Sequence, residues 1–437
     1  MANTKMMAGT RDFDVGGDFA RAARELTACV RDADLAGQRR ARAAFLAAHA
    51  AALYAHASED LTRFLRLPDL LQAAAQRVEG LLPSTVDLAR EAQLPLAQQQ
   101  GVGIDQLLFL AHVLDDADCG AHLLQAMRLA RDESLAQLPH YLASGRLQLG
   151  AASVERVGKA SYVTLCRPAV LNAEDEASLA DLEVAVDLAL LDTRSEVVVL
   201  RGSRVDGPRH GGRRVFCSGI NLTRLYQGHI APLWYIEREL GVVHKIFRGL
   251  APPWRTKESF EATREKPWIA QVDGFAIGGG CQYLLVMDSI VAAADAYLSL
   301  PAQKEGIIPG AANLRLPRWV GERLARQLLL ADRRIECASP EGRMICDLVV
   351  APEAVEAAVQ GVVERLCASG VVSYAANRRA LRVAQEPLDV FRRYMALYAR
   401  EQAYCHYAPA LVANLRRHWN SRRGAALNRD TGSGTDA

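Results

Sequence analysis

Residues 271–288 read QVDGFAIGGGCQYLLVMD, an apolar segment that runs into three consecutive glycines. Glycine adopts backbone conformations that other residues rarely reach, so this run lets a strand turn sharply into a helix. The first N–H groups of a helix have no acceptor within that helix. We therefore expect the amides around Gly278, Gly279 and Gly280 to be bare and suited to holding a developing oxyanion. The alternative is that these glycines only allow tight packing of the strand on the helix.

Short strand and helix segments alternate around this stretch. The apolar runs ASYVTLCRP (160–168) and EVVVLRGS (196–203) precede it, a helical segment lies between them from about Glu174 to Leu191, and SIVAAADAYLSLP (289–301) follows. Strand, helix and strand in that order favour parallel pairing through crossover connections. The sequence therefore predicts an α/β core.

Alanine- and leucine-rich segments flank this core on both sides. From about Phe19 to Ser144, apolar residues recur at helical spacing with few β-branched runs, which predicts helices. A second helical region is expected from about Pro317 to Trp419. The predicted division is an all-helical N-terminal domain at 1–155, the catalytic core at 156–345, C-terminal helices at 346–420 and a disordered tail at 421–437.

Composition limits the classes of protein to consider. The 52 basic and 50 acidic side chains give a net charge of +2, which provides no reason to expect a nucleic-acid or membrane surface. The nine cysteines are odd in number and dispersed, as is typical of reduced thiols in a cytoplasm. The chain has no apolar run of roughly 20 residues, the length that a membrane span needs, and its start lacks the apolar segment of a secretion signal. We therefore predict a cytoplasmic protein.

The sequence also lacks the usual local signatures of metal and nucleotide sites. Its ten histidines form no His-x-His or HExxH pattern, and no Cys-x-x-Cys occurs. No GxGxxG follows a strand, and GxxxxGK[ST] is absent. The prediction is an enzyme with no metal and no cofactor, although a metal site assembled from residues far apart in the sequence stays open.

Five ordered motifs resemble the crotonase (enoyl-CoA hydratase/isomerase) superfamily over about residues 158–346. The resemblance implies a crotonase-like core of ββα units wound into a spiral. It also implies C-terminal helices, about Val372 to Trp419 here, that build a homo-oligomer, either a trimer or a dimer of trimers. The motifs are RPAVLNAED (167–175), EVVVLRGS (196–203), FCSGINL (216–222), KPWIAQVDGFAIGGGCQ (266–282) and LSLPAQKEGIIPGAANLRLPRWVG (298–321).

Within the superfamily, the long N-terminal helical region, Ile220 and Gln282 resemble the cofactor-independent dioxygenases that act on 3,5-dihydroxyphenylacetyl-CoA and O2 in glycopeptide-antibiotic biosynthesis. By this resemblance, the amides of Ile220 and Gly279 form an oxyanion hole for the thioester carbonyl. Two preset backbone donors would each contribute roughly 3 to 4 kcal/mol to the transition state. The branched side chain of Ile220 would narrow the space over the thioester.

Two carboxylates of the superfamily's hydratases are missing from this chain. Those enzymes carry one glutamate where this sequence has Gln282 and another just after the proline of LSLP, where it has Ala302. An amide cannot take up and return a proton near pH 7, so hydration would lose two groups that each contribute about 10²- to 10⁴-fold. The resemblance instead implies an enolate that reacts with O2 and yields 3,5-dihydroxyphenylglyoxylate and free CoA. No base for the α-proton is assigned.

The resemblance also places three side chains around the dihydroxyphenyl ring, namely Glu174, Arg238 and Gln282. Glu174 and Arg238 each have an alternative explanation that involves no ligand. Glu174 lies where a helix begins, so its negative charge could simply stabilise the helix dipole without contacting a substrate. Arg238 lies between Glu237 and Glu239 and could belong to a solvated charge run. Gln282 directly follows the glycine loop, which makes its assignment the safest.

A glycine-rich basic loop is the predicted binding site for the phosphates of coenzyme A. The loop SRVDGPRHGGRRVF (203–216) carries Arg204, Arg213 and Arg214, whose guanidinium groups suit charge-assisted bonds to phosphate. The alternative is a solvated loop without a ligand.

Two other functions stay open from the sequence. One is a crotonase-type thioesterase or isomerase, which would need an acid such as Glu305 or Asp288 to swing into the site. The other is a non-catalytic assembly subunit, against which the glycine loops argue because a scaffold does not need exposed amides.

Overall fold

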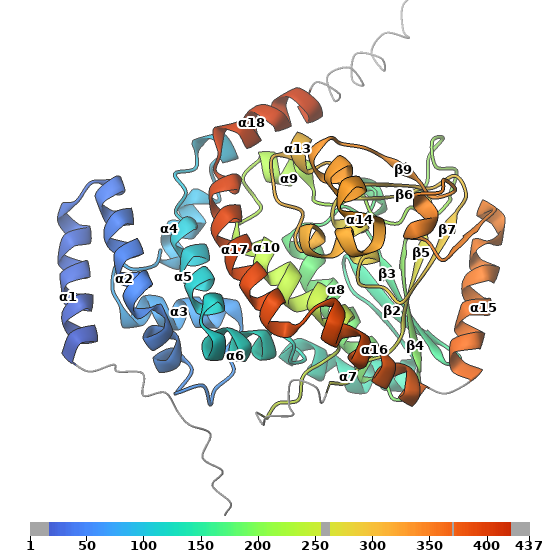
Figure 1. The fold of residues 1–437 in the computed structure, drawn as a ribbon, viewed down its shortest axis with the longest axis horizontal. Helices are drawn as coiled ribbons and strands as arrows, with labels where there is room; N and C mark the ends of the chain where they lie inside the picture. The colour runs from blue at the N-terminus through green and yellow to red at the C-terminus, as the bar shows by residue number, and fades with distance from the viewer. Residues whose placement is uncertain (1–16, 255–262, 369–370, 421–437) are drawn as a thin grey trace, which may run out of the picture.

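The computed structural model describes residues 17–254, 263–368 and 371–420, and the predicted tail at 421–437 lies outside these ranges. The first elements along the chain are helices, as the periodicity of Phe19 to Ser144 predicted (Figure 1). Local capping fixes some of their ends: the Asp34 side chain accepts from the Gly37 amide at the start of α2. The helices are α1 (Gly17–Asp32), α2 (Leu35–Ala57), α3 (Leu67–Arg77), α4 (Thr85–Glu91), η1 (Leu96–Gln98), α5 (Ile104–Asp115), α6 (Ala117–Met127) and α7 (Asp132–Ser144).

A seven-stranded sheet forms the core in the order β1-β2-β3-β4-β5-β7-β10. β1, β2 and β3 pair antiparallel, whereas β3, β4, β5, β7 and β10 run parallel, so the predicted parallel core is confirmed. β5 is buried along its whole length, as expected of a strand covered on both faces. The strands are β1 (Arg146–Gln148), β2 (Ala152–Val157), β3 (Ala160–Leu165), β4 (Val197–Gly202), β5 (Trp268–Val272), β7 (Ser289–Ala293) and β10 (Leu348–Val350).

A second, three-stranded sheet has the order β6-β8-β9. It is built from β6 (Phe275–Ile277), β8 (Tyr297–Ser299) and β9 (Ile335–Glu336). The sequence did not predict β1, β2, β9 or β10, whereas β6 is the strand expected directly before the three glycines. β1 and part of β2 fall inside the range 1–155, and β10 falls inside 346–420, although both ranges were expected to be helical. The domain limits themselves stay a prediction.

Helices cover the large sheet and connect its strands. α8 packs on β2 and β3, and α15 packs on β4, β5 and β7. The remaining helices are η2 (Pro168–Val170), α8 (Glu176–Leu191), α9 (Leu222–Tyr226), α10 (Leu233–Glu237), η3 (Arg238–Val243), α11 (His244–Arg248), α12 (Gly279–Leu284), α13 (Ala302–Glu305), α14 (Ala312–Leu330), η4 (Gly342–Met344), η5 (Pro352–Ala354), α15 (Val355–Ala368), α16 (Val371–Gln385), α17 (Leu388–His406), α18 (Pro409–Leu415) and η6 (Arg416–Asn420).

Helices from the two ends of the chain pack against each other. α17 lies along α5, and the red and cyan ribbons run side by side in Figure 1. Arg392 on α17 donates to the backbone oxygens of Leu114 and Asp115 at the end of α5. The N-terminal helices therefore join the C-terminal helices that border the core.

Buried ion pairs, here called the Lys245 cluster, tie the N-terminal helices to α8 and α11. Lys245 and Asp187 are fully buried and their Nζ and Oδ1 atoms lie 2.7 Å apart, while Glu183 Oε1 lies 2.8 Å from the same Nζ. Arg66 donates to both oxygens of Glu183 at 2.7 and 2.8 Å, and Arg131 Nη1 donates to Oε2 at 3.2 Å. The cluster thus holds three cations against two carboxylates.

All nine cysteines are free thiols, in agreement with the expectation from their dispersion. Within residues 17–254, 263–368 and 371–420, every helix is too short or too polar to cross a lipid bilayer.

Candidate active site

Two glycine-bearing loops touch each other beside the core. A Cβ atom on Gly219 would lie 2.8 Å from the Ile277 oxygen and 3.2 Å from the Gly279 nitrogen. Gly219 has a φ of 81° and Gly278 a φ of 52°, values that L side chains rarely adopt. Gly219 is therefore needed for the loops to approach this closely, whereas Gly278 is favoured by its backbone conformation alone.

The amides of Ile220 and Gly279 are free of backbone acceptors among the described residues. The backbone N–H of Glu174 donates to the Gly219 carbonyl oxygen at 2.8 Å, and the backbone carbonyl of Glu174 accepts from the Asn221 N–H at 2.7 Å. In such a parallel bridge the middle residue, Ile220, turns its own N–H away from that partner. Gly279 is the first residue of α12, so its N–H has no acceptor inside that helix.

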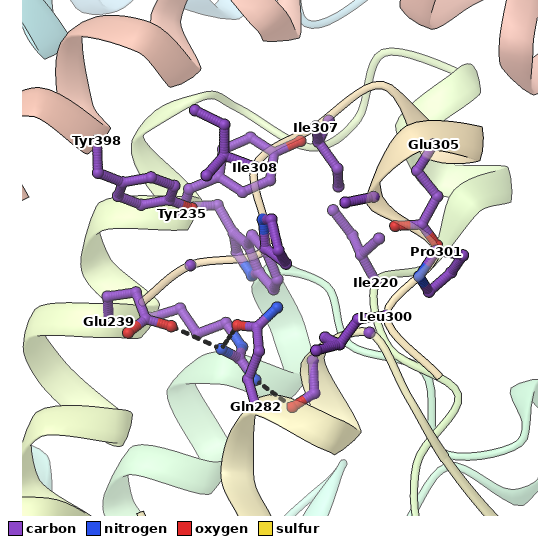
Figure 2. Close-up of a pocket in the computed structure, with 17 residues that line it drawn as sticks. Ile220, Tyr235, Glu239, Gln282, Leu300, Pro301, Glu305, Ile307, Ile308 and Tyr398 are labelled. Carbon is purple, nitrogen blue, oxygen red and sulfur yellow. Dashed lines mark hydrogen bonds and ion pairs between the residues drawn. The ribbon is translucent and has the colours of Figure 1, made fainter. Parts of the chain in front are cut away.

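Ile220 and Gly279 line one pocket. Its walls are largely apolar, and its polar side chains come from α10, η3, α12, α13 and α17 (Figure 2). Ile220 is only 7% exposed. The lining residues that matter below are Ile220, Tyr235, Arg238, Glu239, Gly279, Gln282, Ala302, Glu305, Gly310 and Tyr398.

The Arg238 guanidinium forms the centre of a buried network at one end of this pocket. Its Nε and Nη2 atoms donate to the two oxygens of Glu174 at 2.9 and 3.1 Å, and Nη2 also donates to the Gly279 carbonyl at 2.9 Å. The Tyr283 hydroxyl donates to Glu174 as well, and the Tyr283 ring lies 4.4 Å from the guanidinium carbon. Burial alone would lower the pKa of Arg238, but Glu174 and the neighbouring Glu239 raise that pKa well above its ordinary value.

The network argues against the solvated alternative for Arg238 and the helix-dipole alternative for Glu174, while their roles toward a substrate stay predictions. Arg238 is 3% exposed and lies at the junction of α10 and the π-helical η3, so it is not part of a solvated charge run. Local π-helical turns are frequent at functional sites. The N-cap of α8 is Asp175, and the Glu174 carboxylate turns to Arg238 instead of to the helix. Sequence reasoning missed Tyr283, although it directly follows Gln282.

Arg238 also fixes the orientation of Gln282. Its Nη1 atom donates to Gln282 Oε1 at 2.8 Å, which leaves the amide nitrogen of Gln282 as the free end of the side chain. Figure 2 shows this nitrogen turned into the pocket. A Cβ on Gly310 would lie 2.6 Å from Gln282 Oε1 and 2.2 Å from Glu239 Oε1, so Gly310 leaves room for both side chains. Gln282 therefore presents a hydrogen-bond donor to a ligand.

Glu305 brings a carboxyl group into the other end of the pocket. Figure 2 shows its side chain reaching from α13 toward Ile220 and Pro301. Glu305 is half-buried, and this burial together with the negative charge of Asp332 raises its pKa to about 8. The sequence considered Glu305 only as an acid that would have to swing in, but it already lines the pocket.

Asp288, the other acid considered, lies elsewhere. Its Oδ1 atom accepts from Arg378 Nε at 2.6 Å and its Oδ2 from the Trp268 amide at 2.8 Å. Asp288 lines a different cavity, between α14 and α16, and has no place in the pocket of Ile220 and Gly279.

The three arginines predicted to bind CoA phosphates do not line this pocket. Arg213 pairs with Asp295 at 2.7 and 3.0 Å. Arg204 and Arg214 both approach Glu356, at 3.3 and 3.2 Å. A phosphate would therefore compete with these carboxylates, and the assignment stays a prediction.

The sequence does not exclude a metal site assembled from residues far apart along the chain. In the described ranges, no group of three or more His, Cys, Asp or Glu side chains is arranged to hold a metal ion.

Comparison with solved structures identifies the architecture. The fold matches an enoyl-CoA hydratase from Mycobacterium avium subsp. paratuberculosis K-10 with a TM-score of 0.51 and 22% identity, over 62% of this chain and 99% of that chain. It matches an enoyl-CoA hydratase from Bacillus halodurans with a TM-score of 0.51 and 18% identity, over 61% and 100% of the two chains. At these identities the likeness concerns the fold alone, and it confirms the predicted crotonase-like core.

Sequence comparison identifies the family. Residues 255–405 match the family described as enoyl-CoA hydratase/isomerase. The chain is 29% identical over 255 residues to a probable enoyl-CoA hydratase of Rhizobium meliloti, covering 57% of this chain and 90% of that protein. It is 46% identical over 381 residues to (3,5-dihydroxyphenyl)acetyl-CoA 1,2-dioxygenase of Amycolatopsis orientalis, covering 86% of each chain. The chain therefore belongs to the enoyl-CoA hydratase/isomerase (crotonase) superfamily and, within it, to the family of this dioxygenase.

Proposed function

We propose that this protein is a cofactor-independent dioxygenase that converts 3,5-dihydroxyphenylacetyl-CoA and O2 to 3,5-dihydroxyphenylglyoxylate and free CoA. The relative with 46% identity over 86% of the chain supports the substrate and the reaction. The single structural observation that carries the proposal is the pairing of two bare amides with a glutamine whose oxygen is held by Arg238. Such a site can stabilise an enolate but has no hydratase-type carboxylate at Gln282.

The amides of Ile220 and Gly279 are the proposed oxyanion hole. Both residues line the pocket, and neither amide has a backbone acceptor among the described residues. Backbone donors that are already in place stabilise a developing charge without reorganising during the reaction. The thioester oxygen would accept from both, so loss of the α-proton leaves its electron pair as an enolate next to the two donors.

Gln282, Arg238 and Glu174 are the proposed recognition group for the dihydroxyphenyl ring. The free nitrogen of Gln282 can donate to a phenolic oxygen, while Arg238 and Glu174 hold the glutamine in that orientation. A buried site that bonds a hydroxyl disfavours an analogue without it, because the donor is then left unpaired. Substrate selection thus follows from the fixed orientation of one amide.

The proposed reaction begins with removal of the α-proton, followed by addition of the carbanion to O2 to give a peroxide. The peroxide oxygen attacks the thioester carbon and expels the CoA thiolate. Cleavage of the O–O bond with loss of the second α-proton leaves the keto acid, so both atoms of one O2 enter the product. The apolar walls around Ile220 would exclude water from the carbanion and the peroxide.

No metal, flavin or other cofactor has a part in this proposal, and the phosphates of CoA are assigned to Arg204, Arg213 and Arg214. A homo-oligomer built through the C-terminal helices, either a trimer or a dimer of trimers, stays a prediction, as does a cytoplasmic location.

Anaerobic mixing tests this function. The purified protein and 3,5-dihydroxyphenylacetyl-CoA are combined under nitrogen with a chelator, and free CoA is measured before and after admission of ¹⁸O2. We expect CoA release only after oxygen enters, with two labelled atoms in the glyoxylate. CoA release at the same rate with and without oxygen, or activity that the chelator abolishes, would contradict the proposal.

A second function has one observation in its favour. Because Glu305 lines the pocket, a crotonase-type isomerase or thioesterase has an acid available. Such an enzyme would turn over a crotonyl or dihydroxyphenylacetyl thioester under nitrogen at the rate seen in air. A non-catalytic assembly subunit would bind neither thioester in calorimetry.

A further inference from the structure

We propose that Glu305 is the base that removes the α-proton of the thioester substrate. This inference rests on the proposed function, since it concerns the first step of that reaction. The hydratase positions, Gln282 and Ala302, carry no acid in this chain. Glu305 lies one helical turn beyond Ala302 and supplies a carboxyl group to the same pocket.

The position of Glu305 suits proton removal next to the oxyanion hole. It lines the pocket together with Ile220 and Gly279, and its side chain reaches toward Ile220 in Figure 2. The α-carbon is bonded to the thioester carbon, so a substrate whose oxygen meets the two amides places its α-hydrogens in this same space. A general base must lie within hydrogen-bond reach of the proton that it takes, and the geometry comes first.

Two other acids lie near Glu305: Glu239 lines the pocket, Glu174 does not, and both are held by the Arg238 guanidinium. Glu174 accepts two hydrogen bonds from Arg238 and a third from Tyr283. Glu239 accepts from Arg238 at 3.1 Å and lies 3.5 Å from Arg315. Among the described residues, the carboxylate of Glu305 has neither an ion pair nor a hydrogen bond from a side chain, and burial and the charge of Asp332 are the influences on its pKa.

The two tyrosines of the pocket are poor bases near neutral pH. Burial raises the pKa of Tyr235, and Glu305 raises it further. Burial, with the charge of Glu239, raises the pKa of Tyr398 well above its ordinary value. Both hydroxyls therefore keep their protons. Burial also raises the pKa of Glu239, but Arg238 and Arg315 hold its carboxylate, so Glu305 is the pocket acid without a cation on its carboxylate among the described residues.

The environment of Glu305 makes it a stronger base than an ordinary carboxylate. Its pKa of about 8 lies close to working pH, where a base combines a useful ionised fraction with a strong pull on a proton. Among the described residues, the charged and titratable groups identified near it are Asp332, Lys304, which pairs with Asp332, and Tyr235. α14 and α18 both pack on α13; no charge of α14 is among the influences on the pKa of Glu305, and α18 carries no titratable side chain within Pro409–Leu415.

The proton balance closes with one carboxylate. Glu305 takes the first α-proton, and the electron pair of the broken C–H bond moves into the enolate held by Ile220 and Gly279. When the peroxide expels the CoA thiolate, the proton passes from Glu305 to sulfur and the carboxylate is restored. It can then take the second α-proton as the O–O bond breaks and release it to solvent.

Solvent exchange under nitrogen measures the first step alone. Wild type and Glu305→Gln are incubated in D2O with 3,5-dihydroxyphenylacetyl-CoA, and deuterium at the α-carbon is followed by mass spectrometry. Because general bases contribute about 10²- to 10⁴-fold, we expect exchange and aerobic turnover to fall by at least ~10²-fold in Glu305→Gln. Thioester affinity, measured by calorimetry, should stay within a few-fold. Exchange at the wild-type rate would overturn the proposal.

Two further variants separate a base from a structural residue. Glu322→Gln, on the exposed side of α14, is the matched control and should exchange like wild type. Asp332→Asn removes the negative charge that raises the pKa of Glu305, so the pH midpoint of exchange should fall below that of wild type. A midpoint that stays in place would argue against Glu305 as the base, even if Glu305→Gln failed to fold.

The same assays keep the two proposals apart. If wild type exchanges its α-proton but releases no CoA after oxygen is admitted, the dioxygenase function fails while loss of exchange in Glu305→Gln still supports the base. If wild type shows oxygen-dependent CoA release and Glu305→Gln exchanges normally, only the assignment of the base fails.

Discussion

Glu174 and Glu305 are two carboxylates near one pocket in opposite environments. Glu174 is 3% exposed, is paired in a bidentate manner with Arg238 and accepts a further bond from Tyr283. The Glu305 carboxylate is half-buried and has no cation paired with it among the described residues; this burial and the charge of Asp332 raise its pKa to about 8. A glutamate side chain thus accepts fixed hydrogen bonds at position 174 and is the proposed proton acceptor at position 305. The difference lies in the partners, not in the residue type.

Arg238→Ala should have the largest effect on stability and turnover, because it removes the cation paired with Glu174. The Glu174 carboxylate would then lack a paired cation, as the Glu305 carboxylate does. Breaking a buried ion pair by removing one partner costs roughly 3 to 5 kcal/mol of unfolding free energy. We expect a loss of this size in urea denaturation, together with loss of turnover. Arg238→Ala combined with Glu174→Gln should recover part of the stability. Equal stability of the single and double variants would contradict the account of this pair.

Gln282→Glu adds a third carboxylate beside the Arg238 guanidinium. The new carboxylate would accept from Arg238 but could no longer donate to a phenolic oxygen. An unpaired buried polar group costs about 1 to 3 kcal/mol, so kcat/KM for the dihydroxyphenyl thioester should fall by about 5- to 150-fold. The loss should be smaller for phenylacetyl-CoA, which has no hydroxyl to bond. Gln303→Glu, on the exposed side of α13, is the control and should keep wild-type kinetics.

Glu305→Gln should change how stability depends on pH. A carboxyl with a raised folded-state pKa binds more protons when folded than when unfolded, between its ordinary value of 4.5 and about 8. Its contribution to folding is therefore present below pH 4.5 and is lost as the pH rises through about 8. We expect Glu305→Gln to become progressively more stable than wild type from pH 5 to pH 8.5 in urea denaturation. A difference between the two proteins that stays constant with pH would refute the raised pKa.

Arg213→Ala should have the smallest effect. Its ion pair with Asp295 is about half exposed on both sides, and such surface pairs are worth roughly 0 to 1 kcal/mol. Unfolding free energy should hardly change, and KM for the CoA thioester should rise by only a few-fold if this arginine meets a phosphate. Arg326→Ala, on an exposed position of α14, is the charge-matched control. An identical KM in the two variants would remove Arg213 from the CoA site.

The regular part of the fold could be predicted from sequence because its signals are local. The apolar runs that became β3, β4, β5 and β7 are buried parallel strands, and their order along the chain fixed the crossovers. β1, β9 and β10 escaped prediction because each is only two or three residues long. Strands this short carry no periodic pattern, and pairing with a distant strand determines their conformation.

Some features of the site could likewise be predicted from the sequence and others could not. The glycine loops could be predicted since consecutive glycines and the absent glutamates are visible in the sequence itself. The fixed orientation of Gln282 could not be, because it depends on Arg238, which is 44 residues away along the chain. Glu305 was placed outside the pocket because the turn of α13 after Pro301, which brings it in, leaves no pattern in a segment of four helical residues.

The Lys245 cluster limits how the chain can be shortened. Its members Arg66 and Arg131 come from the N-terminal helical region, whereas Glu183, Asp187 and Lys245 come from α8 and α11. A protein trimmed to begin after residue 131 would keep two anions facing a single ammonium group at a newly uncovered surface. The N-terminal helical region thus supplies two of the three positive charges that face Glu183 and Asp187, so a shortened protein should retain it.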